Sequence, residues 1–64
     1  MEDNSKFKTY MDNLTRIAHK EAVEAIMKEC MVTRYTIYQW KGGTIRIRPY
    51  YKQGIEKALS VKIF

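Results

Sequence analysis

The sequence predicts an all-α fold: one domain of four or so short helices that contains a helix-turn-helix. Two observations predict it. From Ser5 to Cys30 the chain has neither glycine nor proline, and its apolar residues recur at three- and four-residue spacing, which is typical of amphipathic helices. The 64 residues are enough for one small domain and exclude a second. We therefore expect a single domain over 1–64, with residues 1–4 frayed.

Two helices are expected before residue 31, one near 5–14 and one near 16–30. Asn13 and Thr15 favour a break between them, because both are weak helix formers and threonine is a good N-cap. The apolar residues that define the two helical patterns are Phe7, Tyr10, Met11, Leu14, Ile17 and Ala18, followed by Ala22, Val23, Ile26, Met27 and Cys30.

A short turn and a third helix follow. Residues 31–33 interrupt the helical pattern, and Thr33 is a suitable cap for a helix that begins at Arg34. The pair of adjacent glycines ends this helix. Ile37 and Trp40 are three residues apart, so they are expected to face the core together.

Residues 44–48 alternate β-branched and basic side chains, which is typical of a short extended segment. On this pattern Ile45 and Ile47 bury one side, and Arg46 and Arg48 point outward.

A fourth helix is expected to open at Pro49, because proline suits the first position of a helix. Its predicted buried side consists of Ile55, Ala58 and Leu59. The apolar residues of 61–64 are expected to close over the core.

The positive charge lies in the second half of the chain. The net charge is +5, but residues 1–30 carry a balance of −1 and residues 31–64 a balance of +6. Five aromatic residues are interleaved with these cations: Tyr35, Tyr38, Trp40, Tyr50 and Tyr51. Cations mixed with aromatics suit a polyanion such as nucleic acid. The alternative is a charge excess that only keeps the protein in solution, with the aromatics in the core.

The composition argues against an enzyme, a metal site and a membrane protein. One histidine and one cysteine give no zinc cluster and no internal disulfide, and paired catalytic carboxylates are hard to build from these acids. No apolar run reaches the roughly 20 residues of a membrane span, and the sequence starts with acidic rather than basic residues. We expect no cofactor, no catalytic or metal-binding residue, no small-molecule substrate and no membrane partner, and a cytoplasmic protein associated with the nucleoid.

Five apolar residues have the spacing that wedges the two helices of a helix-turn-helix together: Ile26, Cys30, Val32, Ile37 and Trp40. The run from Val32-Thr33-Arg34 through Ile37, Trp40 and Gly43 resembles that of DNA-binding proteins of the Cro and phage-repressor class. More narrowly, residues 29–34, 38–43 and 63–64 are similar to small uncharacterised DNA-binding proteins of Bacteroides-type bacteria and their phages. The resemblance covers roughly residues 18–64. The chain departs from it at Met27, where the class usually has alanine, and at Met31, where it usually has glycine.

The resemblance implies sequence-specific binding of double-stranded DNA and a role in transcription regulation, with a phage or mobile-element origin and homodimers on DNA. It implies base contacts by residues of the third helix, namely Arg34, Tyr35, Tyr38 and Gln39. It implies phosphate contacts by Thr33, Lys41, Arg46, Arg48 and Lys52.

Two other functions stay open at this point. The basic aromatic face could bind an acidic protein, as a small phage-encoded inhibitor would, or it could bind RNA. Tyr35 and Tyr38 could also pack against the first helix or a partner chain instead of contacting bases.

Overall fold

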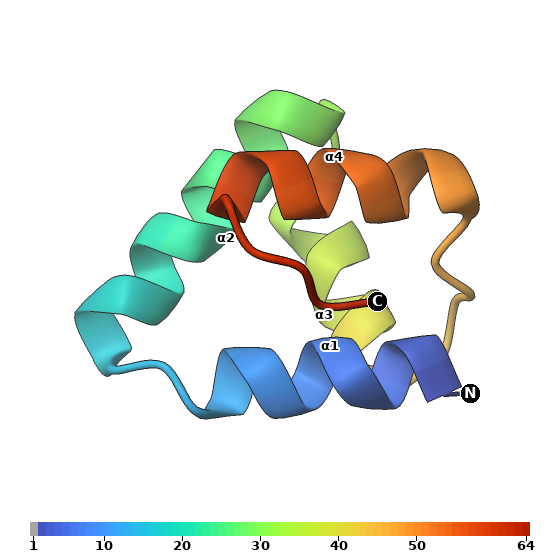
Figure 1. Cartoon of the computed structure of the whole chain (residues 1–64), viewed down its shortest axis with the longest axis horizontal. Helices are drawn as coiled ribbons and strands as arrows, with labels where there is room; N and C mark the ends of the chain where they lie inside the picture. The colour runs from blue at the N-terminus through green and yellow to red at the C-terminus, as the bar shows by residue number, and fades with distance from the viewer. Residues whose placement is uncertain (1) are drawn as a thin grey trace.

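The computed structural model describes residues 2–64, and over these residues the chain forms four α-helices and no strand. They are α1 (Glu2–Asp12), α2 (Arg16–Cys30), α3 (Arg34–Gly42) and α4 (Pro49–Leu59). This confirms the predicted all-α class. α2 packs mainly against α4, and α1 packs against α3. In Figure 1, α4 and α1 lie above and below, and α2 and α3 connect the two levels.

The first helix begins earlier than the sequence predicted. We expected residues 1–4 to be frayed, but α1 starts at Glu2; Met1 lies outside the described residues. The reason is Asn4, which is only 2% exposed. Its amide Nδ2 donates hydrogen bonds to the carbonyl oxygens of Trp40 (2.9 Å) and Ile45 (2.8 Å). The first turn of α1 is therefore fastened to the end of α3 and to the loop that follows.

The expected N-caps of the second and third helices are confirmed. The Thr15 hydroxyl accepts a hydrogen bond from the Ala18 amide, and the Thr33 hydroxyl accepts one from the Thr36 amide. Each bond satisfies a backbone donor that the first turn of a helix leaves free. These two caps fix the N-terminal ends of α2 and α3.

The turn between α2 and α3 has a left-handed backbone at Met31, with φ of 54° and ψ of 45°. Glycine adopts this conformation freely, whereas another residue pays about 1 kcal/mol for it. Met31 thus adopts the left-handed conformation for which the resembled class has glycine.

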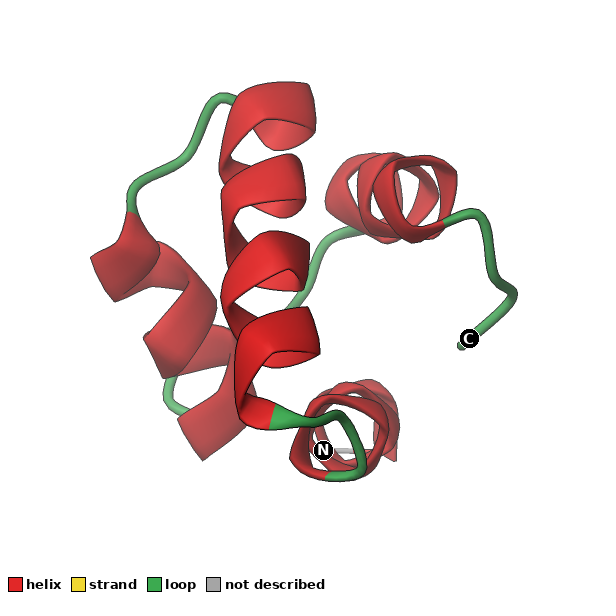
Figure 2. Cartoon of the chain, turned by 90° about the vertical axis from the view of Figure 1, so that its left-hand side faces the viewer, coloured by secondary structure: helices red, strands yellow, loops and turns green. Residues whose placement is uncertain are grey.

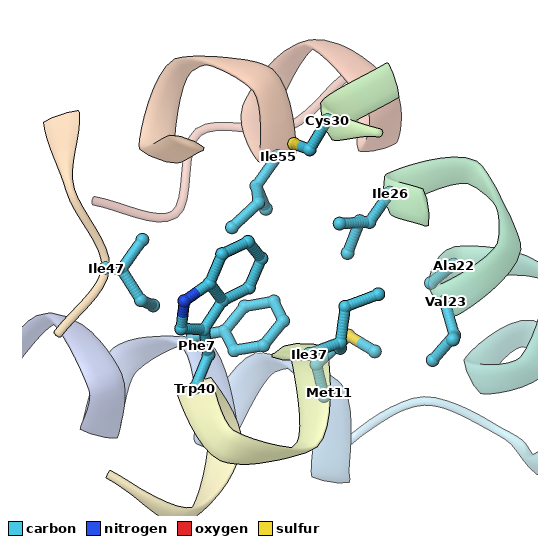
Figure 3. Close-up of a cluster of buried hydrophobic side chains, with 10 residues drawn as sticks. All are labelled: Phe7, Met11, Ala22, Val23, Ile26, Cys30, Ile37, Trp40, Ile47 and Ile55. Atoms are coloured by element: carbon cyan, nitrogen blue, oxygen red, sulfur yellow. The ribbon is translucent and has the colours of Figure 1, made fainter. Parts of the chain in front are cut away.

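The core lies where all four helices meet, as Figure 3 shows. Trp40 is fully buried at its centre, with its ring 6.4 Å from Phe7 and 5.2 Å from Tyr51, measured between centroids. The other core side chains are Met11, Ala22, Val23, Ile26, Cys30, Ile37, Ile47 and Ile55. The predicted core face of the third helix is thus confirmed, since both Ile37 and Trp40 belong to this cluster.

Ile45 and Ile17 were expected inside but lie at the surface. Residues 44–48 form an irregular loop rather than a strand, and only Ile47 enters the core while Ile45 remains exposed. Ile17 is 72% exposed, because the chain changes direction at the break before α2 and the apolar stripe of α1 does not continue across it.

The segment after α4 folds back between α4 and α1 (Figure 1). The backbone amides of Ile63 and Phe64 donate to one carboxylate oxygen of Glu56, at 2.9 and 3.0 Å. These bonds, that of Phe64 first, lower the pKa of Glu56. Ile63 and Phe64 pack against the core as the sequence predicted, whereas Val61, expected to do the same, remains exposed.

Candidate nucleic-acid interface

The third helix presents a buried side and an exposed side. Ile37 and Trp40 fix its inner side in the core. Arg34, Tyr35 and Tyr38 lie on the outer side and are exposed, with Tyr35 at 69%. In Figure 2, α3 lies beside α2, at an angle to it, on the side away from α4. An α-helix held in this way has the shape that enters the major groove of DNA.

Gln39, the fourth residue expected to contact bases, is only partly exposed. Its backbone carbonyl accepts hydrogen bonds from the amides of Gly43 and Thr44, which end the helix. The structure therefore places Gln39 at the margin of the outer face rather than at its centre.

A cleft of about 460 Å³ opens between the first half of α2 and the outer side of α3. It is lined by Arg16, Ile17, His19, Lys20, Val23, Arg34 and Tyr38. Three of these side chains carry positive charge. Among the described residues, none of the three forms an ion pair with a carboxylate.

Sequence reasoning missed Arg16 and Lys20 as interface residues. The net charge of residues 1–30 is −1, so this half of the chain did not look basic. The acids of α2 all follow Arg16 and Lys20 along the helix, and the sum over the half hides the positive charge at its start. A usable signal was present: Arg16 and Lys20 are four residues apart in the first turns of a helix, so they share one face. That face adjoins Arg34 only in the folded chain.

Two of the lysines expected to hold phosphates are already engaged with carboxylates. Lys41 is partly buried, with its Nζ 3.4 Å from Asp12 Oδ1, and Lys52 forms an ion pair with Asp3. The pKa of Asp3 is lowered chiefly by the hydrogen bond from Lys52. These pairs fasten α1 to α3 and α4, which is a structural use of both cations.

The carboxyl group of Asp12 is shared by two lysines. The hydrogen bond from Lys8, at 2.6 Å, is the main cause that lowers the pKa of Asp12, and Lys41 lowers it further. Lys41 also lies 5.9 Å from the ring centroid of Tyr38, so it borders the cleft.

The other expected phosphate ligands lie on the surface. Arg46 and Arg48 are exposed in the loop between α3 and α4, and no ion pair holds either of them within residues 2–64. Thr33 is exposed at the start of α3, where its hydroxyl acts as the helix cap.

The alternative in which the two tyrosines of α3 pack against the first helix is not what the chain adopts. Tyr35 and Tyr38 are both exposed, and Tyr38 forms part of the cleft wall. Their rings are accessible to a partner.

The comparisons with known proteins give no match: no family model, no curated protein and no solved structure matches the chain. The resemblance to the Cro and phage-repressor class thus remains an expectation, and the site is argued from its geometry. In the part of the chain that the structure describes, no helix is long and apolar enough to cross a membrane. No group of three or more potential metal ligands occurs among these residues either.

Proposed function

We propose that the chain binds double-stranded DNA through the outer side of α3 and the cleft beside it, as a transcription regulator of phage or mobile-element origin. The DNA would lie along α3 with its major groove over Arg34, Tyr35 and Tyr38. An arginine can donate two hydrogen bonds to a guanine edge, and the tyrosine rings can contact bases or the methyl group of thymine.

The observation that carries this proposal is the separation of free from paired cations. Five lysines pair with carboxylates, and these pairs link or stabilise helices: Lys6, Lys8, Lys41, Lys52 and Lys57. By contrast Arg16, Lys20 and Arg34 meet in one cleft without an acid partner among residues 2–64. A purely solubilising charge excess gives no reason for such a concentration next to an exposed helix face.

Arg16 and Lys20 would contact phosphates on one side of the groove. They stand in the first turns of α2, where the positive end of the helix dipole also favours an anion. Arg46 and Arg48, in the loop that follows α3, supply cations for a second stretch of backbone. Such contacts fix the position of a protein on DNA without selecting sequence.

Selection of bound sites from random duplex DNA tests the proposal. We expect an enriched sequence whose affinity falls with salt, with a slope of about −0.9 per phosphate contact in a plot of log affinity against log salt. The absence of binding to any duplex at low salt would overturn the proposal.

An acidic protein partner is the second candidate. It is favoured by Ile17, Tyr35 and Tyr38, which place exposed apolar surface among the cations. Competition decides between the candidates: for a DNA-binding protein, the selected duplex displaces structured RNA and acidic polypeptide when each is added at an equal concentration of charge.

A further inference from the structure

Asn4 joins the loop between α3 and α4 to the first turn of α1. Its buried amide Nδ2 donates to two carbonyl oxygens, that of Trp40 at 2.9 Å and that of Ile45 at 2.8 Å. An amide nitrogen carries two hydrogens, so these two bonds use both of its donors. One planar group thereby connects the last turn of α3 to the loop and fixes the distance between them.

The orientation of this amide follows from its partners. Carbonyl oxygens only accept, so exchanging Nδ2 with Oδ1 would turn an acceptor toward two acceptors. The Oδ1 atom of Asn4 is buried and accepts a hydrogen bond from no group of residues 2–64. The side chain is therefore held by the two bonds that it donates, and an ionised aspartate, which has the same shape but no donor, could not replace it.

The loop has few other contacts that hold it in place. The Thr44 amide donates to a carbonyl oxygen of α3, but within residues 2–64 no amide of 45–48 donates to a backbone carbonyl. Ile47 is buried in the core, which holds one point of the loop. In Figure 1 the loop runs from the start of α4 toward the start of α1, where Asn4 lies. The bond from Asn4 to Ile45 is thus a main constraint on the loop between α3 and Ile47.

This loop carries Arg46 and Arg48, the cations that would contact a second stretch of DNA backbone. They can reach phosphates while α3 lies in the groove only if the loop keeps its distance from α3. We infer that Asn4 is a positioning residue of the nucleic-acid interface, an inference that rests on the proposed function. By holding the Ile45 carbonyl beside the end of α3, it places both arginines for phosphate contact, although its own side chain is buried and touches no DNA.

The salt dependence of binding to the selected duplex tests this inference. Asn4→Ala removes both donors, so the variant should lose one or both phosphate contacts of the loop. Each contact contributes about −0.9 to the slope of log affinity against log salt, so the ratio of wild-type to variant affinity should fall about 3-fold to 12-fold between about 50 and 200 mM salt. A loss of stability alone would leave the number of phosphate contacts unchanged. Ile55→Val is the control, because it shortens a buried side chain of α4 and should keep the wild-type slope.

A double-mutant cycle separates positioning from a general effect on the fold. In a protein that carries both Arg46→Ala and Arg48→Ala, Asn4→Ala should cause no further loss of affinity, because the groups that it positions are gone. All proteins are compared under conditions in which circular dichroism shows them folded. Where Asn4→Ala does not fold, Asn4→Ser is compared in the same way, since its hydroxyl keeps one donor.

A further measurement uses the free wild-type protein. We expect the backbone amides of 45–48 to have NMR order parameters of about 0.85, as in the helices, although they form no backbone bonds of their own. Order parameters below about 0.6 in this loop would overturn the inference and leave the proposed function intact. An unchanged salt slope in the Asn4 variant, or an equal loss of affinity with and without the two arginines, would do the same. Failure of the wild type to bind any duplex would overturn both.

Discussion

Met31 occupies the most strained backbone position of the helix-turn-helix. Its φ of 54° lies in the left-handed region, and its side chain is 90% exposed, so no packing within residues 2–64 compensates for the strain. The turn keeps its shape because contacts on both sides hold it. Thr33 caps the first turn of α3, and Cys30 is buried at the end of α2.

Replacing Met31 by glycine should therefore stabilise the protein. We expect Met31→Gly to be about 1 kcal/mol more stable than Met31→Ala, because both remove the side chain but only glycine adopts a positive φ without strain. Denaturant unfolding of the two variants measures the difference. Equal stabilities would show that the turn relaxes to another conformation when the side chain is shortened.

At the scale of helices, α2 and α4 are in close contact where Gly54 faces Cys30. A β-carbon added at Gly54 would lie 2.7 Å from the Cys30 sulfur, a distance at which either the buried Cys30 side chain or one of the two helices must move. Cys30 is a buried thiol whose pKa is raised by its burial, so its role here is packing.

Gly54→Ala should destabilise the protein by about 1–3 kcal/mol, because the overlap outweighs the gain in helix propensity. In the Cys30→Ala background the sulfur is absent, and the same substitution should instead stabilise by up to about 1 kcal/mol. A double-mutant cycle from thermal or denaturant unfolding tests this reversal of sign. If the changes in stability caused by Gly54→Ala and Cys30→Ala are additive, the overlap with the Cys30 sulfur does not destabilise the protein.

The segment after α4 depends on the ionised form of Glu56, whose carboxylate accepts from two backbone amides. Because the pKa of Glu56 is lowered in the folded protein, its contribution to stability is present above the ordinary glutamate value of about 4.3 and is lost as the pH falls below it. Glu56→Gln should unfold with a weaker pH dependence between pH 5 and pH 2 than the wild type. Asp3 and Asp12 titrate in both proteins, so the difference between the two curves isolates Glu56. Parallel curves would show that the two amide bonds do not depend on the charge.

The positions of the helices could be predicted from the sequence because local chemistry sets them. Thr15, Thr33 and Pro49 act within one turn of their own position, and apolar spacing shows which side of a helix is buried. The early start of α1 could not be predicted, because the bonds of Asn4 join it to carbonyl groups 36 and 41 residues away. Ile17 shows the same limit, since its exposure depends on the direction that the chain takes at the break before α2.

Across the whole molecule, charge is sorted by contacts between helices that are distant in sequence. The outer face of α3 could be predicted from its own spacing, so Arg34, Tyr35 and Tyr38 are exposed as expected. The ion-pair partners of the lysines could not be predicted, because Lys41 and Lys52 pair with acids of α1 that are distant in the sequence. Within residues 2–64, five of the seven cations without an ion-pair partner come from the start of α2, the start of α3 and the loop before α4, and the other two are Lys28 and Lys62.

Variants of these free cations should fail in two different ways. Arg34→Ala should cost about 1–3 kcal/mol on the selected duplex and little on a scrambled one, because Arg34 is the cation that we propose contacts a base. Arg16→Ala and Arg46→Ala should weaken binding to both duplexes about equally and reduce the salt slope by about one phosphate contact each. Lys57→Ala is the control, since its cation pairs with Glu29 on the opposite part of the molecule. Equal losses for Arg34→Ala on both duplexes would show that α3 does not select sequence.

The small size of the interface predicts two protein chains on each DNA site. α3 has nine residues, so it can contact only a few base pairs, and helix-turn-helix proteins bind two half-sites about one turn of DNA apart. We expect the selected sequence to be a palindrome with two chains per duplex.

Val61 remains exposed for a contact between the chains, whereas Ile63 and Phe64 partly cover the core of their own chain. Val61→Asp should therefore weaken cooperative binding to two half-sites while leaving binding to one half-site and thermal stability unchanged. Analytical sedimentation with duplexes of one and two half-sites measures the stoichiometry, and a strictly one-to-one complex on both duplexes would refute the dimer.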